Sequence, residues 1–447
     1  MRRICLALPT NRACPEAIAG LYDEAAYAAR EFGVEVHMVV LDSSAPPVRA
    51  RHRATVDGLP PTPNVVVSLL DEDAQRAFLT EAIAISGLAD GDRLLDLMLP
   101  RGVSYGAVTN RIFLIAAALG CESVHRRDSD SRYQSLGGEP MFPIHHEAGA
   151  LGRVAGDLAD SVSESTLDRD QAGRTVAIAG ASFVGELSVD ISEIEQLDPE
   201  VYREVVSLWA PSDWTEEQKR ELVDESFRGA GTEPFVSDHA TLGLVDPMRI
   251  DMCNIAFHRG AYERVPVLPA LDTIGSDYFL MHAVHSAGLP GVLHNRHIVN
   301  YYTPERRTDE GFAAYQLRFA KFFLSMLYLN DIYERMDEAG SSLLDEGGRL
   351  RSETIAAMAR DSTLLDTSEN RWRLDVIGRG YRKLGGRYAR FTETLTERGD
   401  GLLEQARTDI EEFAMLVEAW QPLVEASRKA AGALRVQHGD RGSTSWN

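Results

Sequence analysis

The tripeptide Asp128-Ser129-Asp130 is the stretch of this sequence that could most directly carry chemistry. Two carboxylates at positions i and i+2 of a loop can converge on one hard cation, because a tight turn brings alternate side chains to the same side. Mg²⁺ and Mn²⁺ are commonly held by one or two carboxylates, with phosphate oxygens completing the octahedron. The same pattern also occurs in solvated turns in which an aspartate caps a helix.

Other polar residues of suitable type follow at long range. Asp277 precedes an apolar helical segment, where it could act as a base towards an acceptor hydroxyl or amine, or could simply cap the helix. His294 and His297 lie in one extended segment, and their odd separation places them on opposite faces, so only one can face a cleft. Arg306 and Arg307 could close over a diphosphate, since a planar guanidinium suits bidentate phosphate recognition, or could be solvated surface charges.

The elements around these residues alternate between strands and helices. Strands are expected at residues 4–8, 34–41, 64–70, 122–126, 174–179, 251–259 and 291–302, and helices at residues 15–32, 72–85, 108–119, 151–162 and 278–286. Polar or acidic residues end the first strands, as Asp42 does for the second. This rhythm predicts an α/β fold with an open, mostly parallel sheet, which binds ligands at the carboxyl ends of its strands.

The character of the chain changes after residue 308. Residues 311–339 predict a long helix with an aromatic stripe that is interpreted as core, and residues 402–434 predict a final amphipathic helix. We therefore expect a catalytic domain over residues 1–307, an α-helical domain over residues 308–436 and a disordered tail over residues 437–447. The C-terminal helices could also pack against a second copy of the chain.

Composition restricts the partners. The formal net charge of −22 argues against binding to nucleic acid or to anionic membranes. An anionic ligand would therefore need a local cationic pocket or a metal. The four cysteines are scattered, which is typical of reduced thiols in a cytoplasmic protein. No apolar run is long enough for a transmembrane helix, and the apolar residues after the N-terminal arginines are read as a first strand.

Several common sites are disfavoured. No G-x-G-x-x-G follows the first strand and no Walker sequence is present, which argues against a dinucleotide-binding dehydrogenase or a P-loop enzyme. His145 and His146, in a predicted loop over residues 137–149, suggest zinc at first sight. Adjacent side chains point apart, however, so a zinc site there is not expected.

Taken in order, these motifs resemble those of the nucleotide-sugar glycosyltransferases of the GT-A fold, over roughly residues 2–307. Pro9-Thr10-Asn11-Arg12 is similar to the start of such enzymes, where the turn lies against the nucleobase. The resemblance implies that Asp42 reads the base or ribose and that Arg111 contacts the donor. It also implies that Asp128, Ser129 and Asp130 form the Asp-x-Asp metal motif, with Asp130 the usual direct ligand.

The later motifs extend this resemblance. The segment from Asn254 to Arg259 is similar to an acceptor-side strand of family-2-like transferases, which implicates Asn254 and His258. Asp277 matches the acidic residue of their Glu-Asp motif, although the sequence here reads Gly275-Ser276-Asp277. His297 resembles the histidine that completes the metal site in retaining members such as mannosylglycerate and glucosyl-phosphoglycerate synthases. Residues 136–246 and the C-terminal helices show no match.

The sequence therefore predicts a glycosyltransferase that uses Mn²⁺ or Mg²⁺, a UDP- or GDP-type sugar donor and a small-molecule or natural-product acceptor. Asp277 is the catalytic candidate, and Arg306 joins the donor-binding residues. Asp277 as a base favours inversion, whereas His297 favours retention, so the stereochemical course stays open. The alternatives are a sugar-1-phosphate nucleotidyltransferase, which normally needs a glycine-rich basic loop after the first strand, and a non-catalytic nucleotide-binding or scaffolding protein.

Overall fold

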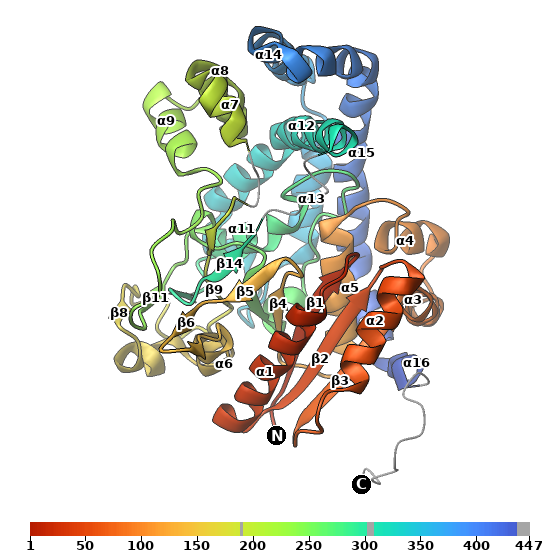
Figure 1. The fold of residues 1–447 in the computed structure, drawn as a ribbon, viewed down its shortest axis with the longest axis vertical. Coiled ribbons are helices and arrows are strands. Elements are labelled where there is room, and N and C mark those ends of the chain that lie inside the picture. The colour runs from red at the N-terminus through yellow and green to blue at the C-terminus, as the bar shows by residue number, and fades with distance from the viewer. Residues whose placement is uncertain (188–190, 302–307, 436–447) are drawn as a thin grey trace.

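The computed structural model describes residues 1–187, 191–301 and 308–435, and it has the predicted α/β architecture (Figure 1). Nine strands form one mixed, mostly parallel sheet in the order β3-β2-β1-β4-β12-β9-β13-β11-β8. These strands are β1 (Arg3–Thr10), β2 (Glu35–Asp42), β3 (Val65–Asp71), β4 (Ser123–Arg127), β8 (Glu164–Ser165), β9 (Ile178–Gly180), β11 (Ala240–Gly243), β12 (Asn254–His258) and β13 (Gly291–His294).

One edge of this sheet gathers the polar strand ends. Strands β3, β2, β1 and β4 are parallel, and Thr10, Asp42 and Asp71 lie side by side where the first three end. Strand β4 ends at Arg127, directly before the Asp128 loop. Strand β12 runs antiparallel to β4 and pairs its first residue, Asn254, with Arg127. The start of β12 therefore lies at the same edge as the ends of its parallel neighbours.

The predicted continuous strand over residues 291–302 is wrong. Its first part is β13 in the large sheet, whereas its second part, β14 (Ile298–Asn300), joins a three-stranded sheet with β10 (Phe183–Gly185) and β5 (Ser131–Tyr133). The chain leaves the first sheet because Arg296 pairs with Asp238 at 2.6 Å and its carbonyl accepts from the amide of Asn254 at 3.1 Å. A further hairpin is formed by β6 (Ser135–Leu136) and β7 (Glu139–Pro140).

Helices were predicted best where the helical spacing of apolar residues continues over a long segment. Helix α1 spans Pro15–Phe32 as expected and ends at Gly33, whose φ of 60° suits glycine. The predicted loop over residues 137–149 contains most of α6, and the predicted helix over residues 151–162 is instead a short 3₁₀ helix, Ala155–Ser161. The other early helices are α2 (Pro46–Asp57), α3 (Glu72–Ser86), α4 (Gly91–Met98), α5 (Tyr105–Ala118), α6 (Ile144–Ala150), α7 (Ser192–Leu197), α8 (Pro199–Val206), α9 (Glu216–Glu225), α10 (Arg259–Tyr262) and α11 (Phe279–Ser286).

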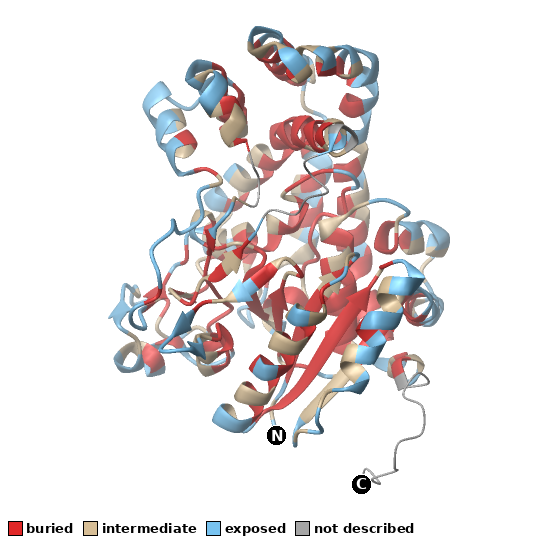
Figure 2. Cartoon of the chain, viewed as in Figure 1, coloured by how far each residue is buried: buried red, intermediate tan, exposed pale blue. Residues whose placement is uncertain are grey.

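The C-terminal helices share one hydrophobic core with the sheet. They are α12 (Asp309–Ala339), α13 (Ser352–Ser362), α14 (Ser368–Leu384), α15 (Gly386–Lys429) and α16 (Ala431–Arg435). Helix α15 packs against α3 and α5, and Trp420 belongs to the same core cluster as Cys5 of β1. Figure 2 shows the buried residues running from the sheet strands into α12. The aromatic stripe of α12 is buried, as its interpretation as core required.

The predicted domain boundary and tail are not tested by this arrangement. The boundary at residue 307 and the tail over residues 437–447 fall outside the described residues. The four cysteines are free and buried, in agreement with the expected reduced thiols. Among the described helices, none combines the length and apolarity that crossing a bilayer requires.

Candidate active site

The loop after β4 holds two aspartates, each next to an arginine. Arg12, in the turn after β1, donates from Nη1 to Oδ2 of Asp130 at 2.7 Å. Arg126, on β4 itself, donates from Nη2 to Oδ1 of Asp128 at 3.2 Å. The parallel pairing of β1 with β4 places these groups together at the carboxyl edge of the sheet. The Asp-x-Asp loop and the Arg12 turn are thus neighbours, as the sequence predicts.

Arg126 also connects this loop to Asp277. Its Nη1 donates to Oδ2 of Asp277 in a buried ion pair and to Oγ1 of Thr109 at 3.2 Å. Asp277 lies in a short 3₁₀ helix, Ser276–Tyr278, that leads into α11. Burial raises the pKa of the Asp277 carboxyl, while Arg126 opposes this rise. For Arg126, burial alone would lower the pKa, but Asp128 and Asp277 outweigh it and raise it.

A cavity of about 350 Å³ opens beside Asp128. It lies between α1 and the second sheet, and its lining includes Arg127, Arg132 and Tyr301 together with Glu16. The guanidinium of Arg132 stacks over the ring of Tyr301, 5.3 Å from its centroid. The arginines around this loop are each paired with a carboxylate, so an anion bound here would compete with those pairs or need a metal ion.

A fully buried network of ion pairs lies next to the Asp128 loop. Arg127, the residue before Asp128, donates to Glu24 of α1 and to Glu147 of α6, each at 2.8 Å. Glu147 also contacts Nδ1 of His125 at 2.7 Å. Burial would raise the pKa of Glu147, but Arg127 and His125 outweigh it and hold it well below its usual range. These buried ion pairs fix the end of β4, and with it the Asp128 loop, although Oε1 of Glu147 has no hydrogen-bond partner among the described residues.

Two predicted donor-binding residues lie away from this cavity. Asp42 is fully buried, and its carboxylate oxygens accept from the backbone N–H of Ser44 and contact Nδ1 of His52, each at 2.8 Å. Arg111 is buried in α5, where it donates to Oε1 of Gln75 at 2.8 Å and to the carbonyl of Met98. Burial lowers its pKa to about 10. Both side chains therefore support the scaffold, because their polar atoms already have partners inside it.

The two predicted acceptor-side residues are also placed differently. Asn254 is fully buried and donates from its amide to the carbonyls of Ser182 and Arg296, each at 3.1 Å. His258 lies at the other end of β12, opposite Ser123 at the start of β4. Four residue steps of about 3.3 Å separate the two ends of this strand. The sequence motif runs along an antiparallel strand, so it cannot present both side chains at one edge.

His297 is not brought to the Asp128 loop. Strand β14 pairs Asn300 with Ser131, whereas His297 lies beyond its other end, where its carbonyl accepts from Gln134. Its Nδ1 accepts from the backbone N–H of Ser182 at 3.2 Å. His294 is buried, 3.8 Å from Glu147. Within the described ranges, no three or more His, Cys, Asp or Glu side chains are grouped so that they could hold a metal.

The remaining predicted site residues lie close to the Asp128 loop or fall outside the residues that the structure describes. Pro9 and Thr10 end β1, and Asn11 is exposed in the turn beside Arg12. Ser129 is buried between the two aspartates. Arg306, like Arg307, lies outside the described residues. His145 and His146 turn to different partners, the hydroxyl of Tyr27 and the carboxylate of Asp238, as adjacent residues should.

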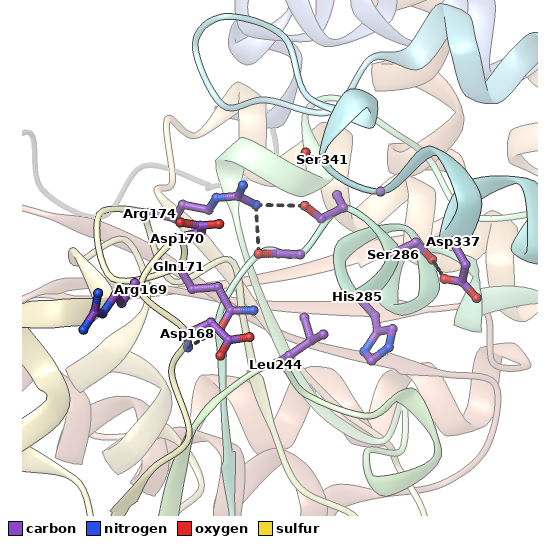
Figure 3. A pocket seen from close by; sticks show the side chains of 13 residues that line it. Asp168, Arg169, Asp170, Gln171, Arg174, Leu244, His285, Ser286, Asp337 and Ser341 are labelled. Atoms are coloured by element: carbon purple, nitrogen blue, oxygen red, sulfur yellow. Dashed lines mark hydrogen bonds between the residues drawn. The ribbon is translucent and has the colours of Figure 1, made fainter.

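A second, mostly apolar cavity of about 110 Å³ lies next to the 3₁₀ turn that carries Asp277. Gly275 and Tyr278, which flank Asp277 in sequence, belong to its wall. A larger and more open hollow of about 650 Å³ involves Arg174, which donates to the carbonyls of Ala287 and Gly288 at 3.0 Å (Figure 3). It shares no lining residue with either cavity near Asp277, so it is not part of the candidate active site.

Sequence reasoning missed Arg126, which links both aspartates. A signal was present, because Arg126 and Arg127 are consecutive charges in a short strand that must cross the centre of the sheet. Buried arginines require carboxylate partners, and partners at long range are what a catalytic cluster needs. The resemblance to family motifs pointed to Arg111 instead of this pair.

Comparison with known proteins adds the following. A family model matches residues 2–435, nearly the whole chain. The chain belongs to a family of unknown function, DUF6271. No curated protein matches this member of DUF6271. Among solved structures, it is similar to "Mannosyltransferase PcManGT from Pyrobaculum calidifontis in complex with GDP-Man and Mn2+" with 14% identity and a TM-score of 0.37, covering 98% of this chain and 89% of that chain.

Proposed function

We propose that this protein is a glycosyltransferase that moves a sugar from a nucleotide-diphosphate donor to a small-molecule acceptor. One observation carries the proposal: Arg126 joins the Asp128 loop, which lines a cavity of about 350 Å³, to the buried carboxylate of Asp277. Ligands of open α/β sheets bind at the carboxyl ends of the strands, which is where this cluster lies. The arginines favour a diphosphate, and Asp277 supplies a group able to take a proton.

The two aspartates of the loop suit Mg²⁺ or Mn²⁺ only together with a donor. Such ions are often held by one or two carboxylates, with phosphate oxygens and water in the other positions. Asp128 and Asp130 provide those two carboxylates, and both are at present paired with arginines. When bound, the ion would neutralise the charge that grows on the departing diphosphate. His297, which the sequence suggested as a third ligand, lies beyond the far end of β14 and is not part of this proposal.

Asp277 is proposed as the group that acts on the acceptor. In a direct displacement, its carboxylate would take the proton of an acceptor hydroxyl while that oxygen bonds to the anomeric carbon and the nucleoside diphosphate leaves. The raised pKa of Asp277 suits this task, since a general base works best with a pKa nearer to the working pH. If the product instead retains the anomeric configuration, Asp277 positions the acceptor. NMR of the product distinguishes these two outcomes.

The decisive experiment is a calorimetric and thermal-shift screen of UDP-, GDP- and dTDP-sugars with and without Mn²⁺. Binding that needs Mn²⁺ is expected, and Asp130→Ala should weaken it by about ten- to a hundredfold, equivalent to about 1.4–2.8 kcal/mol. Asp23→Ala, which removes an exposed carboxylate from α1, serves as the matched control and should bind as the wild type does. A protein that binds none of these donors would have to be a non-catalytic member of the fold.

A further inference from the structure

The apolar cavity beyond Asp277 is built mainly from aromatic side chains. Trp209 lies 5.2 Å from Phe227 and 5.3 Å from Phe322, measured between ring centroids, and the second pair meets edge to face. On another wall, His282 stacks on Tyr333 with ring centroids 4.0 Å apart. An apolar cavity of about 150 Å³ is known to accept benzene, and this cavity of about 110 Å³ is somewhat smaller, so it can take at most one ring.

The backbone of this cavity shows a strained residue. Phe227 has a φ of 63°, which is rare for a bulky side chain. This conformation turns the chain between α9 and β11 so that the Phe227 ring packs against Trp209 and lies 6.1 Å from Phe319. Strain of this kind persists where the surroundings impose it, and it is concentrated at functional sites. The strained residue is part of the cavity wall itself.

One wall carries a negative charge without a matching cation. Asp251 accepts from the hydroxyl of Tyr278 at 2.8 Å and from the backbone N–H of Cys253 at 2.9 Å, and both donors are neutral. No ion pair to Asp251 is found in the part of the chain that the structure describes. His282, on the opposite wall, stays neutral because burial lowers its pKa to about 3. A carboxylate in an apolar cavity attracts a cationic group of a ligand.

The position of the cavity relative to Asp277 defines its role. Tyr278 follows Asp277 directly and its hydroxyl reaches Asp251, while Gly275 stands two residues before Asp277 in the same wall. Arg126 pairs with Asp277 and with Asp128 of the loop. A molecule seated in the apolar cavity would therefore lie next to the 3₁₀ turn that carries Asp277.

We infer that this cavity binds the apolar, ring-bearing part of the acceptor, with a protonated amine of the same molecule beside Asp251. Calling this ligand an acceptor rests on the proposed function. Binding of such a ligand in the cavity does not depend on that function. The substrate class is thus an amphiphilic arylalkyl amine or a larger natural product that carries such a group. A wholly polar acceptor, such as a free sugar, would leave the aromatic walls and Asp251 unused.

Calorimetry with three matched probes tests this inference: 2-phenylethylamine, 2-phenylethanol and 3-phenylpropionate. The amine should bind at least tenfold more tightly than the carboxylate. Asp251→Asn should lower affinity for the amine by about tenfold and leave that for 2-phenylethanol unchanged. Met248→Trp, which places bulk on a half-buried wall residue, should abolish binding of the amine and the alcohol.

Leu244→Trp is the matched control, since it adds the same ring to an exposed residue of the open hollow in Figure 3. It should bind all probes as the wild type does, and near-wild-type melting temperatures would show that both variants fold. Equal binding by the Met248 variant, or equal affinity for amine and carboxylate, would overturn the inference. If the protein binds a nucleotide-sugar donor but none of the probes, this inference fails and the proposed function stands. If it binds the probes but no donor, the proposed function fails and this inference stands.

Discussion

The cavity beside Asp128 and the cavity next to the Asp277 turn differ in their chemistry and in the parts of the chain that form them. The first is lined by charged and aromatic residues of α1, β4 and the second sheet. The second is lined mostly by aromatic and aliphatic residues, many of them from the segment over residues 207–229 and from α12. A diphosphate and an apolar ring have opposite solvation needs, so two separate cavities let one protein bind both.

The contact between the two regions is the Arg126–Asp277 pair, and breaking it should have the largest effect. Arg126→Met would leave the Asp277 carboxylate buried without its cation. Removal of one partner from a buried pair typically costs about 3–5 kcal/mol, because the remaining charge is left uncompensated. The free energy of unfolding, measured by urea denaturation, should fall by this amount, and donor binding should be lost with it.

The matched control is Arg132→Met, which removes an exposed guanidinium paired with the exposed Glu16. Surface pairs contribute about 0–1 kcal/mol, so its stability should stay within about 1 kcal/mol of the wild type. A small effect of Arg126→Met, no larger than that of Arg132→Met, would mean that Asp277 does not depend on Arg126 and that the two cavities are unconnected.

A second buried aspartate, which lines neither cavity, provides a reference for Asp277. Asp409 of α15 lies 2.7 Å from Lys321 of α12, and burial raises its pKa to about 6 against the opposing effect of Lys321. Its usual value is 3.8. Between about pH 4 and 6 the folded state binds the proton more tightly than the unfolded state, so Asp409 contributes stability at low pH that is lost as the pH rises.

Asp409→Asn should remove this contribution. One pKa unit corresponds to about 1.4 kcal/mol. From pH 4 to pH 6, the unfolding free energy of the wild type should therefore fall by about 1–3 kcal/mol relative to that of the variant. Urea denaturation across that interval measures it. Donor and probe binding at pH 7 should not change in the variant, and a loss of either would show that α15 is coupled to the cavities.

The smallest expected effect concerns the apolar cavity alone. Ile274→Val removes one methylene from a buried wall residue and should cost about 0.5–1.5 kcal/mol of stability. Affinity for 2-phenylethanol should change by a few fold, while affinity for a nucleotide sugar should stay the same. Calorimetry of both ligands on one preparation makes the comparison, and a change in donor affinity would argue that the cavities form a single site.

Most of the α/β framework could be predicted from the sequence, because it depends on local periodicity. The apolar runs of β1 to β3, the helix from Pro15 to Phe32 and its ending at Gly33 are each encoded within a few residues. Helix α2 was not expected, although proline is favoured in the first turn of a helix, where Pro46 and Pro47 stand. The Asp128 loop and the Arg12 turn each follow an expected strand, and the parallel pairing of β1 with β4 makes them neighbours.

What the sequence by itself determined is therefore the order of elements and the identity of the two acidic groups, in the Asp128 loop and at Asp277. Only the tertiary structure decided which cations hold them, that His258 lies at the far edge of the sheet, and that β13 and β14 belong to different sheets. The physical reason is that a side chain's burial and partners depend on strands and helices distant in sequence. Arg126 and Asp277 are 151 positions apart, and no local pattern encodes their contact.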